Sequence, residues 1–148
     1  MEKMILTIDQ GTTGTGVHLV DARGRVRKSF DKEHRQYYPN PGWVEHDANE
    51  IWMNVQLGIQ NLLKGEKSLK IEAVGITNQR ETVVAWSRKS GQPLCPAIVW
   101  QCRRTADFCD SLRKREGFLQ RSNARPDWLW TLTFQPLKFA GCSRTSAL

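Results

Sequence analysis

Short apolar runs and a turn rich in glycine and threonine alternate over the first twenty residues. The runs at residues 5–8 and 17–20 have the length of buried strands, and residues 10–16 between them permit a tight reversal. The pattern therefore predicts a hairpin of strands at 4–9 and 17–20, followed by a more polar strand from residue 25 to about residue 37. An antiparallel start of this kind excludes a plain β–α–β opening.

A helix is predicted between Asp47 and Gly65, where the apolar spacing changes to a period of 3.6. Asp47 is a suitable N-cap, and Glu50, three residues later, completes a capping box. Gly65 is suited to end the helix, because glycine adopts the left-handed conformation at that position without strain. The apolar positions expected on its buried face are Ile51, Trp52, Val55, Ile59, Leu62 and Leu63.

The chain that follows predicts strands at 69–77, 82–86 and 96–100 and a charged amphipathic helix at 105–115. Strands and helices in this order indicate an α/β domain built on a mixed sheet. From residue 118 onward neither the strand period nor the helix period persists. We therefore expect no regular packed element in that segment.

Length and composition fit a globular protein. The 148 residues are 39% apolar and 25% charged, which is ordinary for a chain that buries a hydrophobic core. No apolar run approaches the ~20 residues that a membrane-spanning helix needs, and the N-terminus lacks the apolar stretch of a secretory signal. A cytoplasmic protein is therefore expected.

The formal net charge of +7 has two interpretations. A basic protein can bind an acidic partner such as nucleic acid, or the excess of lysine and arginine can be a solvated surface. Aromatic and basic residues form no repeating pattern, so we expect no nucleic-acid partner. The four cysteines form no CxxC pair and have no histidine at ligand spacing, so no zinc site is expected.

Residues 9–13, Asp-Gln-Gly-Thr-Thr, carry the strongest local signal for a ligand. A carboxylate at the end of a buried strand, such as that of Asp9, can hold Mg²⁺. Gly11 lets the backbone approach an anion, and the hydroxyls of Thr12 and Thr13 can donate to phosphate oxygens together with successive N–H groups. The glycine spacing is that of a P-loop, but a valine stands where the lysine is required. A plain hairpin turn is the alternative.

Residues 78–82, Asn-Gln-Arg-Glu-Thr, follow directly after the predicted strand at 69–77, at a strand end where open α/β sheets bind ligands. Arg80 offers donors beside the carboxylate of Glu81, a pair that can hold neighbouring hydroxyls of a polyol. A solvated ion pair in a loop is the alternative. Trp100, again after a predicted strand, can form an apolar wall against a small ligand or can belong to the core.

Taken together, these segments resemble the glycerol kinases, a branch of the FGGY carbohydrate kinases, which share the actin/Hsp70 ATPase fold. The resemblance runs in order from about residue 4 to residue 115. The segment Asn-Gln-Arg-Glu-Thr is specific, because FGGY kinases for other sugars carry different residues there. The implied fold is an incomplete actin/Hsp70-like (ribonuclease H-like) α/β lobe with a mixed sheet. The resembling segments are residues 9–13, 41–47, 51–52, 75–82 and 97–101.

The resemblance implies a nucleotide site in the first hairpin, with ATP and Mg²⁺ as cofactors. Asp9 matches the residue beside the metal and nucleotide and is the implied metal ligand, and Thr12 and Thr13 match contacts to the nucleotide phosphates. Gly14 matches a third position of the phosphate loop, which is usually serine in the family. Gly16 departs from the family, since many members carry an arginine there that contacts the nucleotide.

The resemblance also implies a glycerol site. Arg80 and Glu81 match the pair that binds the glycerol hydroxyls, and Trp100 matches the aromatic wall beside its carbons. The implied reaction transfers the γ-phosphoryl group of ATP to glycerol and gives sn-glycerol 3-phosphate and ADP. The implied partners are glycerol and ATP, with no nucleic acid and no membrane span, and family members are often homo-oligomeric.

No residue here matches the proton-accepting aspartate of the family, which lies further along the family chain. No catalytic residue is therefore implied, and we expect a truncated kinase that is inactive alone. A non-catalytic remnant that keeps weak phosphate or polyol binding is the alternative.

The resemblance ends near residue 117. We therefore expect a partial N-terminal kinase domain at 1–117 and a poorly ordered tail outside the family at 118–148. Residues 127–139, back-translated with chosen synonymous codons and read from the third base, give Leu-Val-Val-Asp-Pro-Tyr-Phe-Ser-Ala-Thr-Lys-Val. This string resembles the family segment whose tyrosine joins the glycerol site. Our hypothesis for the tail is a frameshift within residues 116–125.

Overall fold

The computed structural model describes residues 1–115. The chain divides into two compact units. The first unit comprises Met1–Arg35 and Asp47–Gln79, and the second comprises Gln36–His46 and the chain from Arg80 onward.

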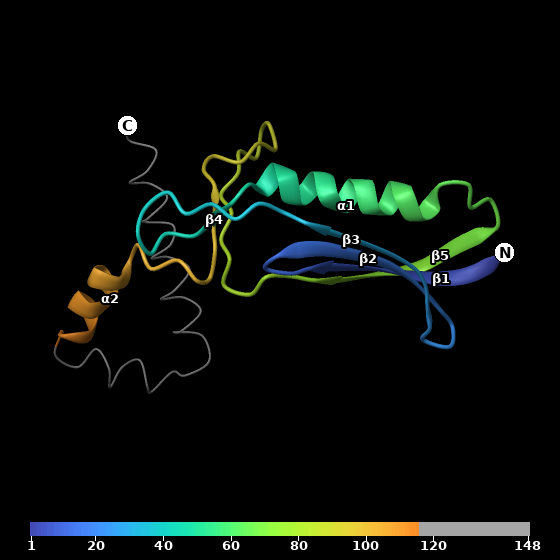
Figure 1. Ribbon diagram of the computed structural model, residues 1–148, viewed down its shortest axis with the longest axis horizontal. Coiled ribbons are helices and arrows are strands. Elements are labelled where there is room, and N and C mark those ends of the chain that lie inside the picture. The colour runs from blue at the N-terminus through green and yellow to red at the C-terminus, as the bar shows by residue number, and fades with distance from the viewer. Residues whose placement is uncertain (116–148) are drawn as a thin grey trace. The chain divides into compact units, whose positions relative to one another are not determined.

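A mixed sheet of four strands forms the centre of the first unit: Glu2–Gln10 (β1), Gly14–Asp21 (β2), Val26–Glu33 (β3) and Leu69–Thr77 (β5). The order is β3–β2–β1–β5 (Figure 1). β1 and β2 form the predicted antiparallel hairpin, and β3 continues it but ends before residue 37. β5 pairs with β1 in parallel, so both strands have their carboxyl ends at the same edge of the sheet. The predicted mixed sheet is confirmed.

Helix α1, Ala48–Leu63, begins and ends where the sequence predicts. Asp47 is its N-cap and accepts a hydrogen bond at 2.8 Å from the backbone N–H of the second helical residue. The predicted capping box is wrong at its second member, because the carboxylate of Glu50 accepts from the backbone N–H of Arg35 at 3.2 Å. Glu50 therefore ties the start of the helix to the segment that follows β3.

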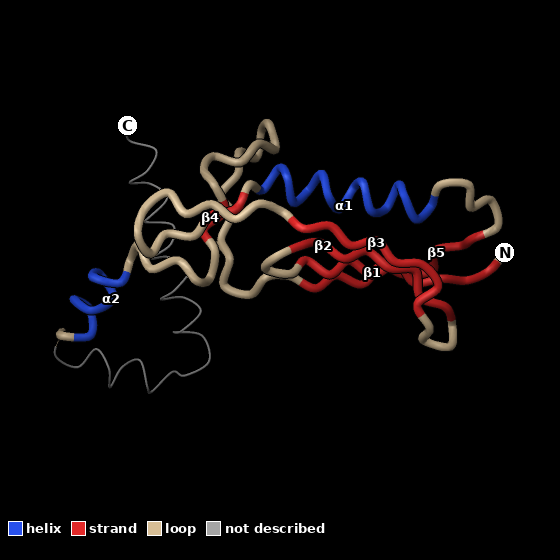
Figure 2. The backbone as a smooth tube through the Cα atoms, in the orientation of Figure 1, coloured by secondary structure: helices blue, strands red, loops and turns tan. Residues whose placement is uncertain are grey.

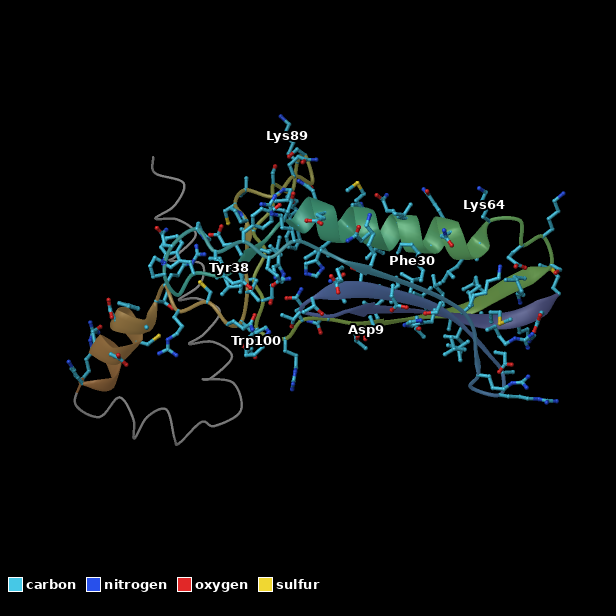
Figure 3. The ribbon with its side chains drawn as sticks, in the orientation of Figure 1. Asp9, Phe30, Tyr38, Lys64, Lys89 and Trp100 are labelled. Carbon is cyan, nitrogen blue, oxygen red and sulfur yellow. The ribbon has the colours of Figure 1, made fainter. Side chains whose placement is uncertain are left out.

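One stripe of α1 packs on the sheet over β2 and β3 (Figure 2). A Cβ atom at Gly58 would lie 2.6 Å from Cγ2 of Val17 and 2.8 Å from Cδ1 of Phe30, so the close approach depends on this glycine. Phe30 projects from β3 toward the helix (Figure 3). Trp52 was predicted on the buried face but is 59% exposed, because it lies about a quarter of a turn away from the stripe. The buried residues of α1 are Asn54, Val55, Gly58 and Leu62.

The hydrophobic core of the first unit lies between α1 and the sheet. Its buried residues are Met4, Leu6, Ile8, Val17, Leu19, Val55 and Leu62. β5 contributes less than its apolar sequence suggests, because Val74 and Ile76 are 54% and 70% exposed. The core therefore rests on β1, β2 and the helix.

The second unit has less regular structure than the sequence predicts. Up to residue 115, its elements are Glu45–His46 (β4), Ala97–Ile98 (β6) and Ala106–Arg113 (α2). The strand predicted at 82–86 is reduced to isolated bridges, and the one predicted at 96–100 is reduced to the two residues of β6. β6 pairs antiparallel with β4, which the sequence pattern did not predict. α2 lies within the helix predicted at 105–115.

A buried ion pair anchors the second unit. Nη2 of Arg104 lies 2.6 Å from Oε1 of Glu45, and the two side chains are 3% and 12% exposed. The Arg104 guanidinium also lies 4.0 Å from the ring centroid of Trp43. Because a buried charge needs compensating partners, these contacts hold the segment before the helix against the chain after residue 80.

Within residues 1–115, no helix is long and apolar enough to cross a membrane. The tail expected at 118–148 lies outside the described residues.

Candidate functional site

Asp9 lies near the carboxyl end of β1, the strand between β2 and β5. Its register partners are Gly16 on β2 and Thr77 on β5. The preceding residue, Ile8, is buried under α1, so the Asp9 side chain projects from the opposite face of the sheet (Figure 3). The Thr77 hydroxyl donates to Oδ1 of Asp9. One carboxylate oxygen is thereby held at the edge where two parallel strands end.

The turn between β1 and β2 is closed by its own backbone and by the side chain of Gln10. The N–H of Gly11 donates to the carbonyl of Gly14 at 2.9 Å. Nε2 of Gln10 lies 3.2 Å from the carbonyl oxygen of Gly11 and 3.5 Å from that of Gly14. The hydroxyl of Thr15, a residue only 1% exposed, donates to Oε1 of Gln10 at 2.6 Å. The Gln10 amide is therefore oriented from both of its ends.

His34 contacts the same turn from the end of β3. Its backbone N–H donates to the carbonyl of Thr13 at 3.1 Å, and its ring is hydrogen-bonded to the backbone of Thr12. Burial lowers the pKa of His34, while the Thr12 hydrogen bond and the charge of Glu50 oppose that shift. Only an acceptor raises the pKa of an imidazole, so the Thr12 group is its carbonyl. The ring therefore donates an N–H to that carbonyl.

Gly14 and Gly16 lie on β2 near the turn and carry no side chain. A Cβ atom at Gly14 would lie 2.8 Å from the carbonyl oxygen of Lys32, so a serine there would require β3 to shift. A Cβ atom at Gly16 would lie 3.0 Å from Nε2 of His18 and 3.1 Å from Oδ1 of Asp31. Both departures from the resembling family therefore coincide with close packing between β2 and β3.

Arg80 and Glu81 lie in the second unit, and both are exposed. Glu81 has a φ of 64°, and it is the only non-glycine residue in the described part of the chain with a positive φ. The left-handed conformation costs a residue with a Cβ atom roughly 1 kcal/mol. Such strain is concentrated at functional sites, and here it sets the direction of the Glu81 side chain.

Trp100 is 51% exposed, which excludes the core position that was its alternative. Val83 and Ile98 exchange two backbone hydrogen bonds, at 3.0 and 2.9 Å. Glu81 lies two residues before Val83, and Trp100 lies two residues after Ile98. The antiparallel register therefore brings both residues to the same end of the bridge.

The predicted site residues thus fall into two groups. Asp9, Thr12, Thr13 and Gly14 share the first hairpin, whereas Arg80, Glu81 and Trp100 belong to the second unit. Sequence reasoning missed Gln10, Thr15 and His34, whose side chains hold the hairpin turn. A polar residue beside a glycine-rich turn is the only signal that could have indicated Gln10, and nothing local to His34 indicates its contact.

The first hairpin offers few protein ligands for a metal ion. Within residues 1–115, no group of three or more His, Cys, Asp and Glu side chains could hold a metal ion. Asp9 supplies a single carboxylate. This suits Mg²⁺ carried by a nucleotide, because the ion keeps several waters and binds one or two carboxylates together with substrate phosphates.

Comparison with known proteins identifies the family. The family model described as the N-terminal domain of the FGGY family of carbohydrate kinases matches residues 4–136. The chain belongs to the FGGY family of carbohydrate kinases. The domain boundary expected at residue 117 stays a prediction.

Curated relatives of this FGGY chain include two bacterial glycerol kinases. The glycerol kinase of Burkholderia cenocepacia (strain HI2424) is 50% identical over 117 residues, which cover 77% of this chain and 23% of the relative. That of Janthinobacterium sp. (strain Marseille) is 52% identical over 128 residues, which cover 82% of this chain and 26% of the relative. The FGGY chain thus spans about a quarter of the length of the relatives that it matches.

Solved structures confirm the predicted fold class. A Plasmodium falciparum glycerol kinase with ADP is 37% identical, with a TM-score of 0.74 over 78% of this chain and 24% of that one. A gluconate kinase from Lactobacillus acidophilus is 26% identical, with the same TM-score over 82% of this chain and 24% of that one. The FGGY chain therefore has the actin/Hsp70-like ATPase fold of these sugar kinases.

Proposed function

We propose that this FGGY chain is the N-terminal part of a glycerol kinase, an enzyme that transfers the γ-phosphoryl group of ATP to glycerol and gives sn-glycerol 3-phosphate and ADP. The observation that carries the choice of glycerol is the difference in identity. Among the solved structures the glycerol kinase is 37% identical and the gluconate kinase of the same fold 26%. The two curated glycerol kinases reach 50% and 52% identity. The conserved fold alone would leave the sugar open.

The first hairpin is the proposed nucleotide site. The hydroxyls of Thr12 and Thr13 and the backbone N–H groups up to Gly14 can donate to phosphate oxygens. Asp9 would hold Mg²⁺ that arrives with the nucleotide. When bound, this ion neutralises charge on the β- and γ-phosphates. The chain's own part is to hold the phosphates in one orientation, which is most of what phosphoryl transfer requires.

The second unit carries the proposed glycerol site. The Arg80 guanidinium can donate to two neighbouring hydroxyls, and the Glu81 carboxylate can accept from them. The exposed face of Trp100 would cover the carbon chain of the ligand. The left-handed backbone at Glu81 supports this role, because a surface ion pair in an ordinary loop would not require that strain.

Titration of the 148-residue chain with glycerol and with MgADP tests both sites. We expect saturable binding of both ligands, and we expect E81Q and R80Q to weaken glycerol binding by roughly tenfold or more, because a ligand hydroxyl then loses a charged partner. MgADP binding should not change in these variants. The variant R88Q, at an exposed arginine in the same unit, is the matched control. Gluconate binding as strong as that of glycerol would contradict the assignment.

A non-catalytic FGGY protein that keeps weak phosphate or polyol binding is the alternative. Both proposals expect binding, and they differ in turnover. An assay of glycerol-dependent ADP release separates them when it is run on a chimera that joins residues 1–115 to the remainder of a glycerol kinase relative, because the 148-residue chain is expected to be inactive alone. Release that is abolished in E81Q supports the kinase, and binding without release in the chimera supports the alternative.

A further inference from the structure

All four carbonyl groups of residues 11–14 accept hydrogen bonds from within the protein. The Gly11 and Gly14 carbonyls accept from Nε2 of Gln10, and that of Gly14 also accepts from the N–H of Gly11. The Thr12 carbonyl accepts from the His34 ring. The Thr13 carbonyl accepts from the His34 backbone N–H.

These hydrogen bonds fix the direction of the N–H groups as well. The structure has no cis peptide bond in the described residues, and in a trans peptide the N–H points opposite to the preceding carbonyl. The N–H groups of Thr12, Thr13 and Gly14 are therefore directed away from the donors that hold the preceding carbonyls. A phosphate that approaches any of these N–H groups meets the N–H dipole, whereas the carbonyl oxygens, which would repel the phosphate, are directed toward donors within the protein.

We propose that Gln10 and His34 are positioning residues of the nucleotide-phosphate turn: they hold its carbonyls toward donors within the protein, so that its N–H groups point away from those donors and can donate to the phosphates. The proposal rests on the proposed nucleotide site in the first hairpin. Neither side chain needs to touch the ligand. The two residues act through the orientation of the backbone between them. Because the hydrogen bonds that fix this orientation lie within the protein, they lower the ordering cost of binding.

Thr15 completes the arrangement. Its buried hydroxyl donates to Oε1 of Gln10, which leaves the Nε2 end of the amide turned toward the two glycine carbonyls. Without this hydrogen bond the amide could rotate and present its oxygen to those carbonyls. Thr15 therefore acts on the turn only through Gln10, and this dependence can be measured as non-additivity.

The test measures MgADP affinity and backbone amide exchange in the 148-residue chain. Q10M keeps the side-chain length and removes both donors, and H34F removes the ring donor. We expect each to raise the MgADP dissociation constant roughly tenfold, which corresponds to the loss of about one hydrogen bond. Exchange without ligand should accelerate at the amides of Gly11 and His34, which donate to the carbonyls of Gly14 and Thr13. Q56M, on the exposed side of α1, is the control and should change neither quantity.

Thr15 variants keep the test decisive if Q10M folds poorly. T15V should weaken MgADP binding by a few-fold, and T15S, which restores the hydroxyl, should recover it. The double variant Q10M/T15V should bind no more weakly than Q10M, because Thr15 acts through Gln10. If the losses of MgADP affinity in Q10M and T15V add up in the double variant, Thr15 does not act through Gln10.

The outcomes separate this proposal from the proposed function. Normal MgADP affinity and unchanged turn exchange in Q10M and H34F would overturn the role of both residues. A wild-type chain that does not bind MgADP would contradict the nucleotide site. The exchange rates would then still decide whether Gln10 and His34 hold the turn.

Discussion

Asp21 holds the turn between β2 and β3 through hydrogen bonds from the backbone N–H groups of Arg23 and Arg25, at 2.9 and 3.0 Å. The side chain of Arg25 also pairs with it at 2.9 Å. The pKa of Asp21 is lowered to about 2, chiefly by the hydrogen bond from the Arg25 backbone, while burial acts in the opposite direction. The charged form is therefore more favourable in the folded state than in the unfolded chain.

This shift predicts how the stability that Asp21 provides depends on pH. Because the pKa is lowered in the fold, the contribution is complete above the ordinary value of about 4 and is lost as pH falls toward 2. D21N should therefore unfold at lower urea concentration than the wild type at pH 7, and the difference should shrink between pH 4 and pH 2. D31N, at an exposed aspartate on β3, is the control. A difference that stays constant down to pH 2 would contradict the assignment.

At the residue scale, the sequence indicated Asp9, Thr12 and Thr13 because their chemistry is local to one motif. It could not indicate His34, which reaches the turn only after β3 pairs with β2 and β2 pairs with β1. It also could not indicate the positive φ of Glu81, because backbone conformation at a non-glycine residue has no compositional signal.

At the scale of elements, the packing of α1 depends on Gly58. An alanine would raise the intrinsic helix propensity by about 1 kcal/mol, but its Cβ would overlap Val17, which is fully buried and cannot move aside. We expect the overlap to dominate, so that G58A lowers the free energy of unfolding by about 1–3 kcal/mol in urea titrations. Q60A, on the exposed side of the helix, should be near neutral. V17A should recover part of the loss in the double variant, and additive losses would contradict the overlap.

The same helix shows what periodicity can and cannot predict. Its limits followed from Asp47 and Gly65, which are local signals that the structure confirms. The apolar face was predicted too wide, because the contact with the sheet is a narrow stripe that includes the polar Asn54 and leaves Trp52 exposed. Which side of an amphipathic helix is buried depends on the surface that the helix packs against. The period of the apolar residues alone does not determine the width of the buried face.

At the scale of the whole molecule, the second unit is built from two separate segments: residues 36–46, which precede α1, and the chain from Arg80 onward, which follows β5. β4 and β6 are each only two residues long, and their pairing joins segments about fifty residues apart in the sequence. Strands of this length carry no alternating pattern. The first unit, whose strands have eight or nine residues, was therefore predictable from the sequence in a way that the second unit was not.

The last prediction concerns the reading frame of the tail. Trp128 and Trp130 each have the single codon TGG, so six bases of the underlying DNA are fixed by the protein sequence. Read from the third base of codon 127, synonymous codons for residues 127–139 can encode the segment Asp-Pro-Tyr-Phe-Ser-Ala-Thr-Lys that resembles the glycerol kinases, and the two tryptophan codons agree with the Leu-Val-Val that precedes it. We expect the DNA after codon 117 to encode that segment in another frame.

Sequencing this stretch of DNA on both strands tests the hypothesis. If none of the three reading frames encodes the tyrosine-containing segment, the hypothesis is wrong. If the segment is present, the protein encoded by a gene with the frame restored should bind glycerol more tightly than the 148-residue chain, because the tyrosine adds a partner for a ligand hydroxyl.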